Sequence, residues 1–126
     1  MLQAQLANAP REEVKEQPKE ERGILQIEVV EAKLDRSTEV WGKQDPFAEL
    51  SIRMQKFKTK THTDGAKAPV WNESTTMDVL DPSEVMKVQV FDEDMTSNDL
   101  ICEGQIELAG ICQNNMSVDD WFPLQF

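Results

Sequence analysis

Apolar and polar residues alternate with a period of two through most of the chain after residue 23. Successive side chains of a strand point to opposite faces, so this alternation predicts strands with one buried face. No segment after residue 23 keeps a helical period for more than two turns. We expect seven short strands, near 24–32, 48–54, 57–61, 75–79, 86–91, 105–108 and 121–124. Seven short strands at roughly regular spacing predict an all-β fold, a β-sandwich.

Residues 1–22 have a different composition from the rest of the chain. They are rich in charged and polar residues and contain prolines at positions 10 and 18. Such a composition is typical of segments without a packed core. We therefore predict a flexible polar N-terminal arm or linker over 1–22 and one domain over 23–126. A short docking helix for a partner is the alternative interpretation of the arm.

The chain is acidic and has the length of one domain. Its 126 residues include 24 acidic and 13 basic side chains, which gives a formal net charge of −11. This charge disfavours nucleic acid as a partner and opposes contact with an anionic membrane unless a cation intervenes. The two cysteines form no CxxC motif, and we find no signal peptide and no apolar run long enough to span a membrane. These features predict a cytoplasmic protein whose membrane contact would be peripheral.

Several carboxylates are concentrated in the sequence that follows one predicted strand. Asp92, Asp94 and Asp99 lie within eight residues of one another, and Asp45 lies upstream in Gly-Lys-Gln-Asp-Pro-Phe. Ca²⁺ takes six to eight oxygen ligands, largely carboxylates, and would relieve the repulsion between these charges. The alternative is a solvated acidic turn, because aspartate favours turns.

Four sequence blocks together resemble the C2 domain family. They are Gly-Ile-Leu-Gln-Ile-Glu-Val-Val-Glu-Ala at 23–32, Gly-Lys-Gln-Asp-Pro-Phe at 42–47, Pro-Val-Trp-Asn-Glu at 69–73, and Val-Phe-Asp-Glu-Asp at 90–94 with Asp-Leu-Ile at 99–101. The resemblance covers 23–126. It implies an eight-stranded antiparallel Greek-key β-sandwich with three loops at one end, and Ca²⁺-dependent binding to phospholipid membranes.

The resemblance also implies a set of metal ligands. In such domains the first and third loops supply the carboxylates. Glu39 stands where aspartate is usual, and Cys102 stands where glycine is frequent, so the site departs from the family pattern at two positions. The implied ligands are Glu39, Asp45, Asp92, Asp94 and Asp99.

The family has eight strands, whereas the alternation predicts seven. We expect the type II permutation, in which the eighth strand follows the Trp121 strand and would lie beyond Phe126. Two alternatives stay open: residues 1–9 fill the gap, or an open sheet edge remains that invites a partner strand.

Two further surfaces are candidates for membrane contact. Trp41 and Met95 lie in the predicted loops, where exposed apolar side chains would enter the headgroup region; the alternative for Trp41 is packing beneath its own loop. The resemblance implies a phosphoinositide contact through a basic strand, and the alternative is a solubilising outer face. That strand contributes Arg53, Lys56, Lys58 and Lys60.

The predicted function is Ca²⁺-dependent binding to anionic phospholipid membranes, with recruitment from the cytoplasm when calcium rises. The alternative is a calcium-independent protein–protein docking module in a scaffold, cytoskeletal or ciliary assembly, using the N-terminal arm or an open sheet edge. The sequence has no Gly-x-Ser-x-Gly elbow, phosphate-binding glycine loop or histidine-based triad, so we do not expect an enzyme.

Overall fold

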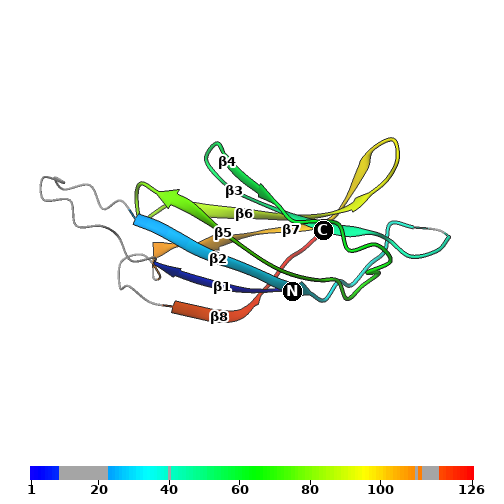
Figure 1. The fold of residues 1–126 in the computed structure, drawn as a ribbon, viewed down its shortest axis with the longest axis horizontal. Helices are drawn as coiled ribbons and strands as arrows, with labels where there is room; N and C mark the ends of the chain where they lie inside the picture. The colour runs from blue at the N-terminus through cyan, green and yellow to red at the C-terminus, as the bar shows by residue number, and fades with distance from the viewer. Residues whose placement is uncertain (9–22, 40, 110, 112–116) are drawn as a thin grey trace, which may run out of the picture.

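The computed structural model of the chain describes residues 1–8, 23–39, 41–109, 111 and 117–126. These residues form two four-stranded antiparallel sheets, with the strand orders β5-β2-β1-β8 and β4-β3-β6-β7. Figure 1 shows the sheets as two layers. The predicted all-β sandwich is confirmed. The eight strands are β1 (Leu2–Asn8), β2 (Gly23–Ala32), β3 (Pro46–Ile52), β4 (Gln55–Lys58), β5 (Val70–Val79), β6 (Val85–Glu93), β7 (Asn98–Glu107) and β8 (Ser117–Phe122).

The hydrophobic core lies between the two sheets and follows the alternation in the sequence. Leu25, Ile27 and Val29 of β2 are buried, as are Leu50 of β3 and Val88 of β6 from the opposite sheet. Full burial of one such side chain stabilises the fold by roughly 1.5–3 kcal/mol. A slip of one residue would turn every one of them toward solvent, so the pattern fixes the strand register.

The eighth strand comes from the N-terminal side of the chain, which corrects two predictions. Residues Leu2–Asn8 form β1, which pairs with β2 on one side and β8 on the other. Leu2, Ala4 and Leu6 are completely buried. The prediction of an arm is therefore wrong for this stretch, and 9–22 lies outside the described residues. The type II permutation is also wrong, because β1 fills the position between β2 and β8 and leaves no gap there.

The C-terminal residues cover part of the outer edge of β7. Glu103 and Gln125 exchange two backbone hydrogen bonds, with N–O distances of 2.7 and 2.8 Å. Gly104 lies directly under this crossing, where an added Cβ atom would be 2.7 Å from the carbonyl oxygen of Pro123. The close approach of the two backbones therefore requires glycine at this position.

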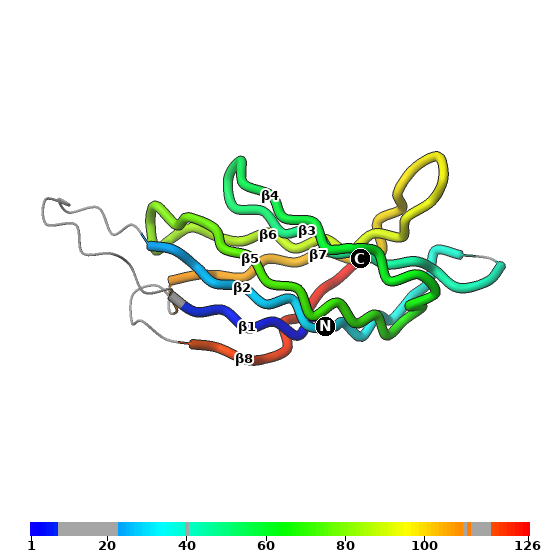
Figure 2. Tube along the Cα trace, viewed as in Figure 1, coloured from blue at the N-terminus to red at the C-terminus, as the bar shows by residue number. Residues whose placement is uncertain are grey.

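Three loops extend from one end of the sandwich (Figure 2). We name them loop 1 (33–45, between β2 and β3), loop 2 (59–69, between β4 and β5) and loop 3 (94–97, between β6 and β7). In the part of the chain that the structure describes, no helix has the length and apolar character needed to cross a membrane.

Candidate metal centre

Asp92 is the buried anchor of the loop end. It lies near the end of β6 and is completely inaccessible to solvent. Its Oδ1 accepts the backbone N–H of Asp45 at 2.8 Å, and its Oδ2 accepts the hydroxyl of Thr38 at 2.7 Å. A buried carboxylate is tolerated only when its oxygens are bonded in this way. Asp92 therefore ties two positions of loop 1, Thr38 and Asp45, to the last residues of β6.

Three carboxylates converge around this anchor. Oxygens of Glu39, Asp92 and Asp94 all lie within 4.8 Å of one another. A hydrogen bond to Asp92 and the charge of Asp92, followed by burial and the proximity of Asp94, raise the pKa of Glu39 to about 7. A hydrogen bond with Asp99, followed by burial and the charges of Asp92 and Asp99, raises the pKa of Asp94. These shifts reflect hydrogen bonds between neighbouring carboxyl groups, which favour the protonated form, together with burial and the repulsion of like charges.

The remaining two predicted ligands lie beside this group. Asp99, at the start of β7, adjoins the group from across loop 3, because its carboxyl group hydrogen-bonds that of Asp94. The Oδ1 of Asp45 accepts the backbone N–H of Asp64 in loop 2, at 2.7 Å, while the Asp45 N–H holds Asp92. The structure thus brings together Glu39, Asp92 and Asp94, joins Asp99 through Asp94, and turns the Asp45 carboxylate toward loop 2.

The donor chemistry of the group fits a hard divalent cation. Every candidate ligand atom is a carboxylate oxygen, and Ca²⁺ prefers such ligands in flexible arrangements. A divalent charge among Glu39, Asp92 and Asp94 would also relieve the repulsion that raises the pKa of Glu39. Cys102 is a buried free thiol whose pKa burial raises to about 11, and it is not a member of this group.

The loop tips carry exposed apolar side chains. Trp41 in loop 1 is 88% exposed and Met95 in loop 3 is fully exposed. The alternative interpretation, in which Trp41 packs beneath its own loop, does not describe this structure. Large apolar side chains that face solvent at one end of a domain are often part of a binding surface.

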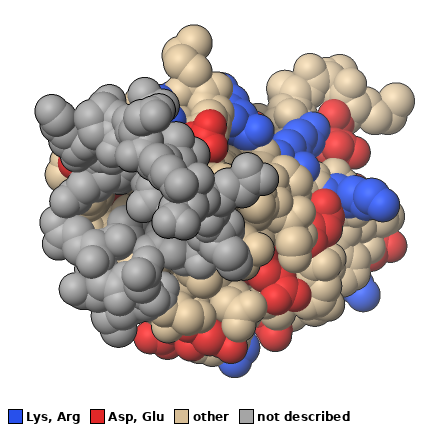
Figure 3. Space-filling model, turned by 60° about the vertical axis from the view of Figure 1, so that its left-hand side comes forward, with Lys and Arg blue, Asp and Glu red and all other residues tan. Residues whose placement is uncertain are grey.

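The predicted basic strand divides into two parts. Lys56, Lys58 and Lys60 are exposed at alternating positions on and just after β4. The Nζ of Lys56 lies 3.6 Å from Glu49, and the Nζ of Lys58 lies 4.3 Å from the centre of the Phe47 ring. Basic and acidic side chains are interspersed on the face seen in Figure 3.

Arg53 stands apart from these lysines. It occupies the turn between β3 and β4 with a φ of 55°. Its guanidinium group lies 2.5 Å from the Glu84 carboxylate and donates a second hydrogen bond to the carbonyl of Asp78 at 3.2 Å. Arg53 is thus engaged in contacts within the fold.

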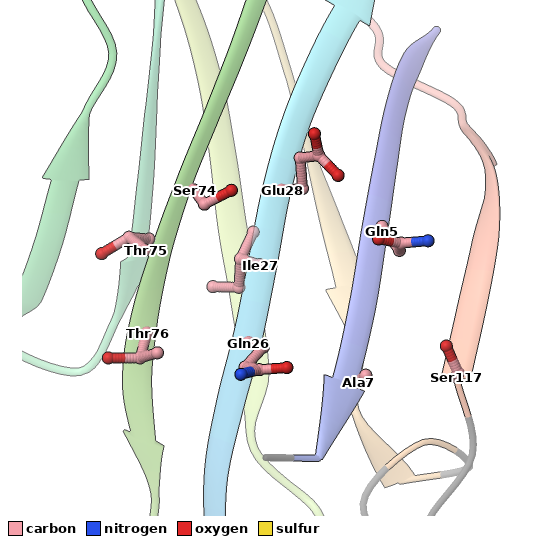
Figure 4. Close-up of a pocket in the computed structure, with 9 residues that line it drawn as sticks. All are labelled: Gln5, Ala7, Gln26, Ile27, Glu28, Ser74, Thr75, Thr76 and Ser117. Carbon is pink, nitrogen blue, oxygen red and sulfur yellow. The ribbon is translucent and has the colours of Figure 1, made fainter.

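A shallow hollow of about 680 Å³ lies on the outer face of the β5-β2-β1-β8 sheet. Figure 4 shows amide and hydroxyl side chains of all four strands around it. It shares no residue with the carboxylate group. Its lining includes Gln5, Gln26, Glu28, Ser74, Thr76 and Ser117.

Two polar residues at the site were not found by sequence reasoning. Thr38 donates a hydrogen bond to Asp92, and Gln44, also in loop 1, is completely buried. Neither belongs to the residue types that signal a metal ligand. The one feature of the sequence that could have pointed to them is their place in the chain, since each directly precedes a predicted ligand.

Sandwich and loops together define a β-sandwich module with an acidic loop end. A profile of the C2 domain family matches residues 23–124. The chain belongs to the C2 domain family.

Relatives with this domain include much longer proteins. The chain is 32% identical over 107 residues to extended synaptotagmin-3 of Mus musculus, a match that covers 81% of this chain and 12% of the relative. It is 32% identical over 91 residues to protein C2-DOMAIN ABA-RELATED 6 of Arabidopsis thaliana, covering 71% of this chain and 51% of the relative. The chain thus spans about an eighth of the extended synaptotagmin that it matches.

Solved structures of similar domains agree with the fold. A calcium-bound structure of two C2 domains of extended synaptotagmin 2 superposes with a TM-score of 0.73 at 25% identity, covering 85% of this chain and 41% of that one. The first C2 domain of RIM from Drosophila covers 98% of both chains with a TM-score of 0.70. Its 19% identity supports the fold alone.

Proposed function

We propose that this C2 domain binds Ca²⁺ at its loop end and thereby docks on anionic phospholipid membranes. The observation that carries the proposal is the convergence of Glu39, Asp92 and Asp94, with the pKa of Glu39 raised to about 7. The similar extended synaptotagmin 2 structure is a calcium-bound one, which supports the choice of ion. In this proposal Asp99 and the Oδ2 atom of Asp45, whose Oδ1 atom bonds Asp64 in loop 2, complete the ligand set.

The residues around the site have distinct roles in this mechanism. Thr38 and the Asp45 amide hold the Asp92 carboxylate in place, so that its free lone pairs face the other ligands. When bound, Ca²⁺ supplies positive charge and open coordination positions for phosphate oxygens. A chain with a net charge of −11 otherwise repels an anionic surface.

Side chains beyond the ion would strengthen the contact. Trp41 and Met95 project from loops 1 and 3 and would enter the headgroup region beside the site. Lys56, Lys58 and Lys60 would supply a second contact for phosphoinositides, each worth about 1 kcal/mol near an anionic surface. We do not assign Arg53 to this contact, because it is bonded to Glu84 and Asp78. The proposed activity is binding without catalysis, at the cytoplasmic face of a membrane.

Vesicle sedimentation tests the proposal directly. With phosphatidylserine vesicles, the domain should pellet in Ca²⁺ and remain in solution in chelator. The double variant Asp92→Asn/Asp94→Asn should lose pelleting in Ca²⁺ and the heat of Ca²⁺ binding in calorimetry. Asp119→Asn/Asp120→Asn removes the same charge from β8 and should behave as the unaltered protein. Equal pelleting with and without Ca²⁺ would refute Ca²⁺-dependent membrane binding. It would instead favour the alternative of a calcium-independent docking module.

A further inference from the structure

Gln44 is the hydrogen-bonding centre beneath the loops. Its side chain is completely buried. The side-chain Nε2 donates to the carbonyls of Arg36 at 3.0 Å and Ala66 at 2.8 Å, and Oε1 accepts the N–H of Thr38 at 3.0 Å. Its backbone carbonyl also accepts the N–H of Ala66 at 3.0 Å. One residue therefore joins two positions of loop 1 to loop 2.

Burial makes the loss of these hydrogen bonds costly in free energy. A buried amide or carbonyl that loses its partner costs about 1–3 kcal/mol, because no water replaces the lost bond. Gln44 satisfies two carbonyls and one N–H of the loops without introducing a charge. Leucine or methionine of similar size would fill the space and leave all three groups without this partner.

Ala66 shows that the contact constrains the backbone. Its φ is 55°, in the left-handed region that residues with a Cβ atom rarely adopt. Such a conformation persists where the surroundings hold it. Gln44 bonds both the N–H and the carbonyl of Ala66, and so holds the residue on both sides.

The same side chain is linked by contacts to the loop 1 ligands. Gln44 binds the N–H of Thr38, whose hydroxyl binds Asp92, and the next residue in the chain is Glu39. A chain of contacts thus runs from Gln44 to two members of the carboxylate group. Asp45, directly after Gln44, bonds Asp92 and Asp64.

We propose that Gln44 is a positioning residue that sets the cation affinity of the site by holding loop 1 against loop 2. The inference rests on the proposed Ca²⁺ site. Gln44 does not touch the ion; it fixes the backbone of Thr38 and hence the approach of Glu39 to Asp92 and Asp94. Residues that orient metal ligands typically change metal affinity 10- to 100-fold when replaced.

The test compares two buried polar residues. Gln44→Met should raise the Kd for Ca²⁺ in calorimetry about 10- to 100-fold. Thr59→Val is the matched control. Thr59 is also buried, and its hydroxyl accepts the N–H of Ala48 and donates to the carbonyl of Lys60, two residues that lie outside loop 1. Both variants should lower the urea midpoint, whereas Thr59→Val should change the Kd less than about twofold.

Hydrogen exchange in chelator supplies a readout that does not depend on the ion. In the unaltered protein the Thr38 amide should be protected, because it donates to the Gln44 side chain. In Gln44→Met that protection should be lost, while the Ala66 amide, bonded to the Gln44 main chain, stays protected. Exchange of the Thr38 amide at the unstructured rate in the unaltered protein overturns the inference even if the variant fails to fold.

The remaining outcomes separate the two proposals. Absence of Ca²⁺ binding by the unaltered protein overturns the proposed function, and this inference with it. Tight binding by the unaltered protein and by Gln44→Met alike overturns the inference alone. A Kd that rises equally in Thr59→Val also overturns it, since the effect then follows general destabilisation.

Discussion

Two acidic groups lie at opposite ends of the sandwich, and their carboxylates are arranged in opposite ways. At the loop end Glu39, Asp92 and Asp94 face one another, and the pKa of Glu39 rises to about 7. In the turn between β5 and β6, Asp81 and Glu84 face donors instead. Bonds from the backbone and hydroxyl of Ser83 lower the pKa of Asp81.

Glu84 shows the same contrast more fully. Burial acts to raise its pKa, but the hydrogen bonds from Arg53 and from the amides of Leu80 and Asp81 outweigh it and lower the pKa. Both groups are acidic in sequence. The two groups differ in their partners: protein donors bond the carboxylates of the turn, whereas those of the loop end lie close to one another, which is where the proposed cation would bind.

Stabilisation by Ca²⁺ gives the largest expected difference between the two ends. At a free Ca²⁺ concentration about one hundred times the Kd, the free energy of unfolding should rise by about 2.7 kcal/mol. Urea titrations with and without Ca²⁺ measure this change. Asp92→Asn/Asp94→Asn should abolish it, whereas Asp81→Asn should leave it intact. If Asp81→Asn lost the Ca²⁺-dependent rise in the free energy of unfolding to the same extent, the two acidic groups would not differ in their relation to the ion.

The pH dependence of Ca²⁺ binding should give the second-largest difference between the two ends. Ca²⁺ must displace a proton from Glu39 whenever the pH lies below its pKa of about 7. The Kd should therefore rise roughly tenfold between pH 8 and pH 6, because a single competing proton weakens binding by about one decade per pH unit below its pKa. Calorimetry at the two pH values, in buffers of different ionisation enthalpy, measures both the Kd and the released proton. Glu39→Gln should flatten the dependence, and Glu84→Gln should preserve it.

The two ends should also respond oppositely to pH in chelator. The pKa of Glu39 is raised from 4.5 to about 7, so the folded state binds the extra proton in that interval. Its contribution to stability is therefore fully present below pH 4.5 and lost as pH rises toward 7. The pKa values of Asp81 and Glu84 are lowered, so their contribution is present above the usual carboxyl range and lost on acidification. Urea midpoints of Glu39→Gln and Glu84→Gln across roughly pH 4 to 8 should reveal opposite slopes relative to the unaltered protein.

Exposed methionines at the two ends provide a matched pair for membrane contact. Met95 in loop 3 and Met54 in the β3–β4 turn are both almost fully exposed. Partial burial of a methionine in the headgroup region should contribute about 1 kcal/mol. Met95→Ser should therefore weaken Ca²⁺-dependent vesicle binding about fivefold, while Met54→Ser should have no effect. Equal weakening by both would show that orientation at the membrane is not set by the loop end.

The sequence predicted the sandwich well because its strands bury one face. Positions such as Leu25, Ile27 and Val29 alternate strictly, and the structure buries all three. β1 was missed although Leu2, Ala4 and Leu6 alternate too. That pattern is short, includes the small side chain of Ala4, and leads directly into a proline-containing charged stretch.

The site was predictable in its residue types but not in its contacts. The family positions pointed to Asp92 and Asp94, which the structure brings together with Glu39. The bond from the Asp45 amide to Asp92 spans 47 residues of sequence, and the Thr38 bond spans 54. Such partners follow from the packing of distant strands, and no local pattern encodes them. Grouping Arg53 with the lysines failed to anticipate its pairing with Glu84 for the same reason.

The smallest expected effect concerns that ion pair. Arg53→Met removes the contact with Glu84 and the hydrogen bond to the Asp78 carbonyl, but retains much of the apolar stem. The pair is partly exposed, with 33% and 16% of the two side chains accessible, so solvent screens it and we expect a loss of about 0.5–1 kcal/mol. Urea unfolding in chelator measures that loss. The Kd for Ca²⁺ should not change, because the turn carboxylates lie at the other end of the sandwich from the ligands. A higher Kd for Ca²⁺ in Arg53→Met would mean that the two acidic ends are coupled through β6. The two ends would then not be independent sites.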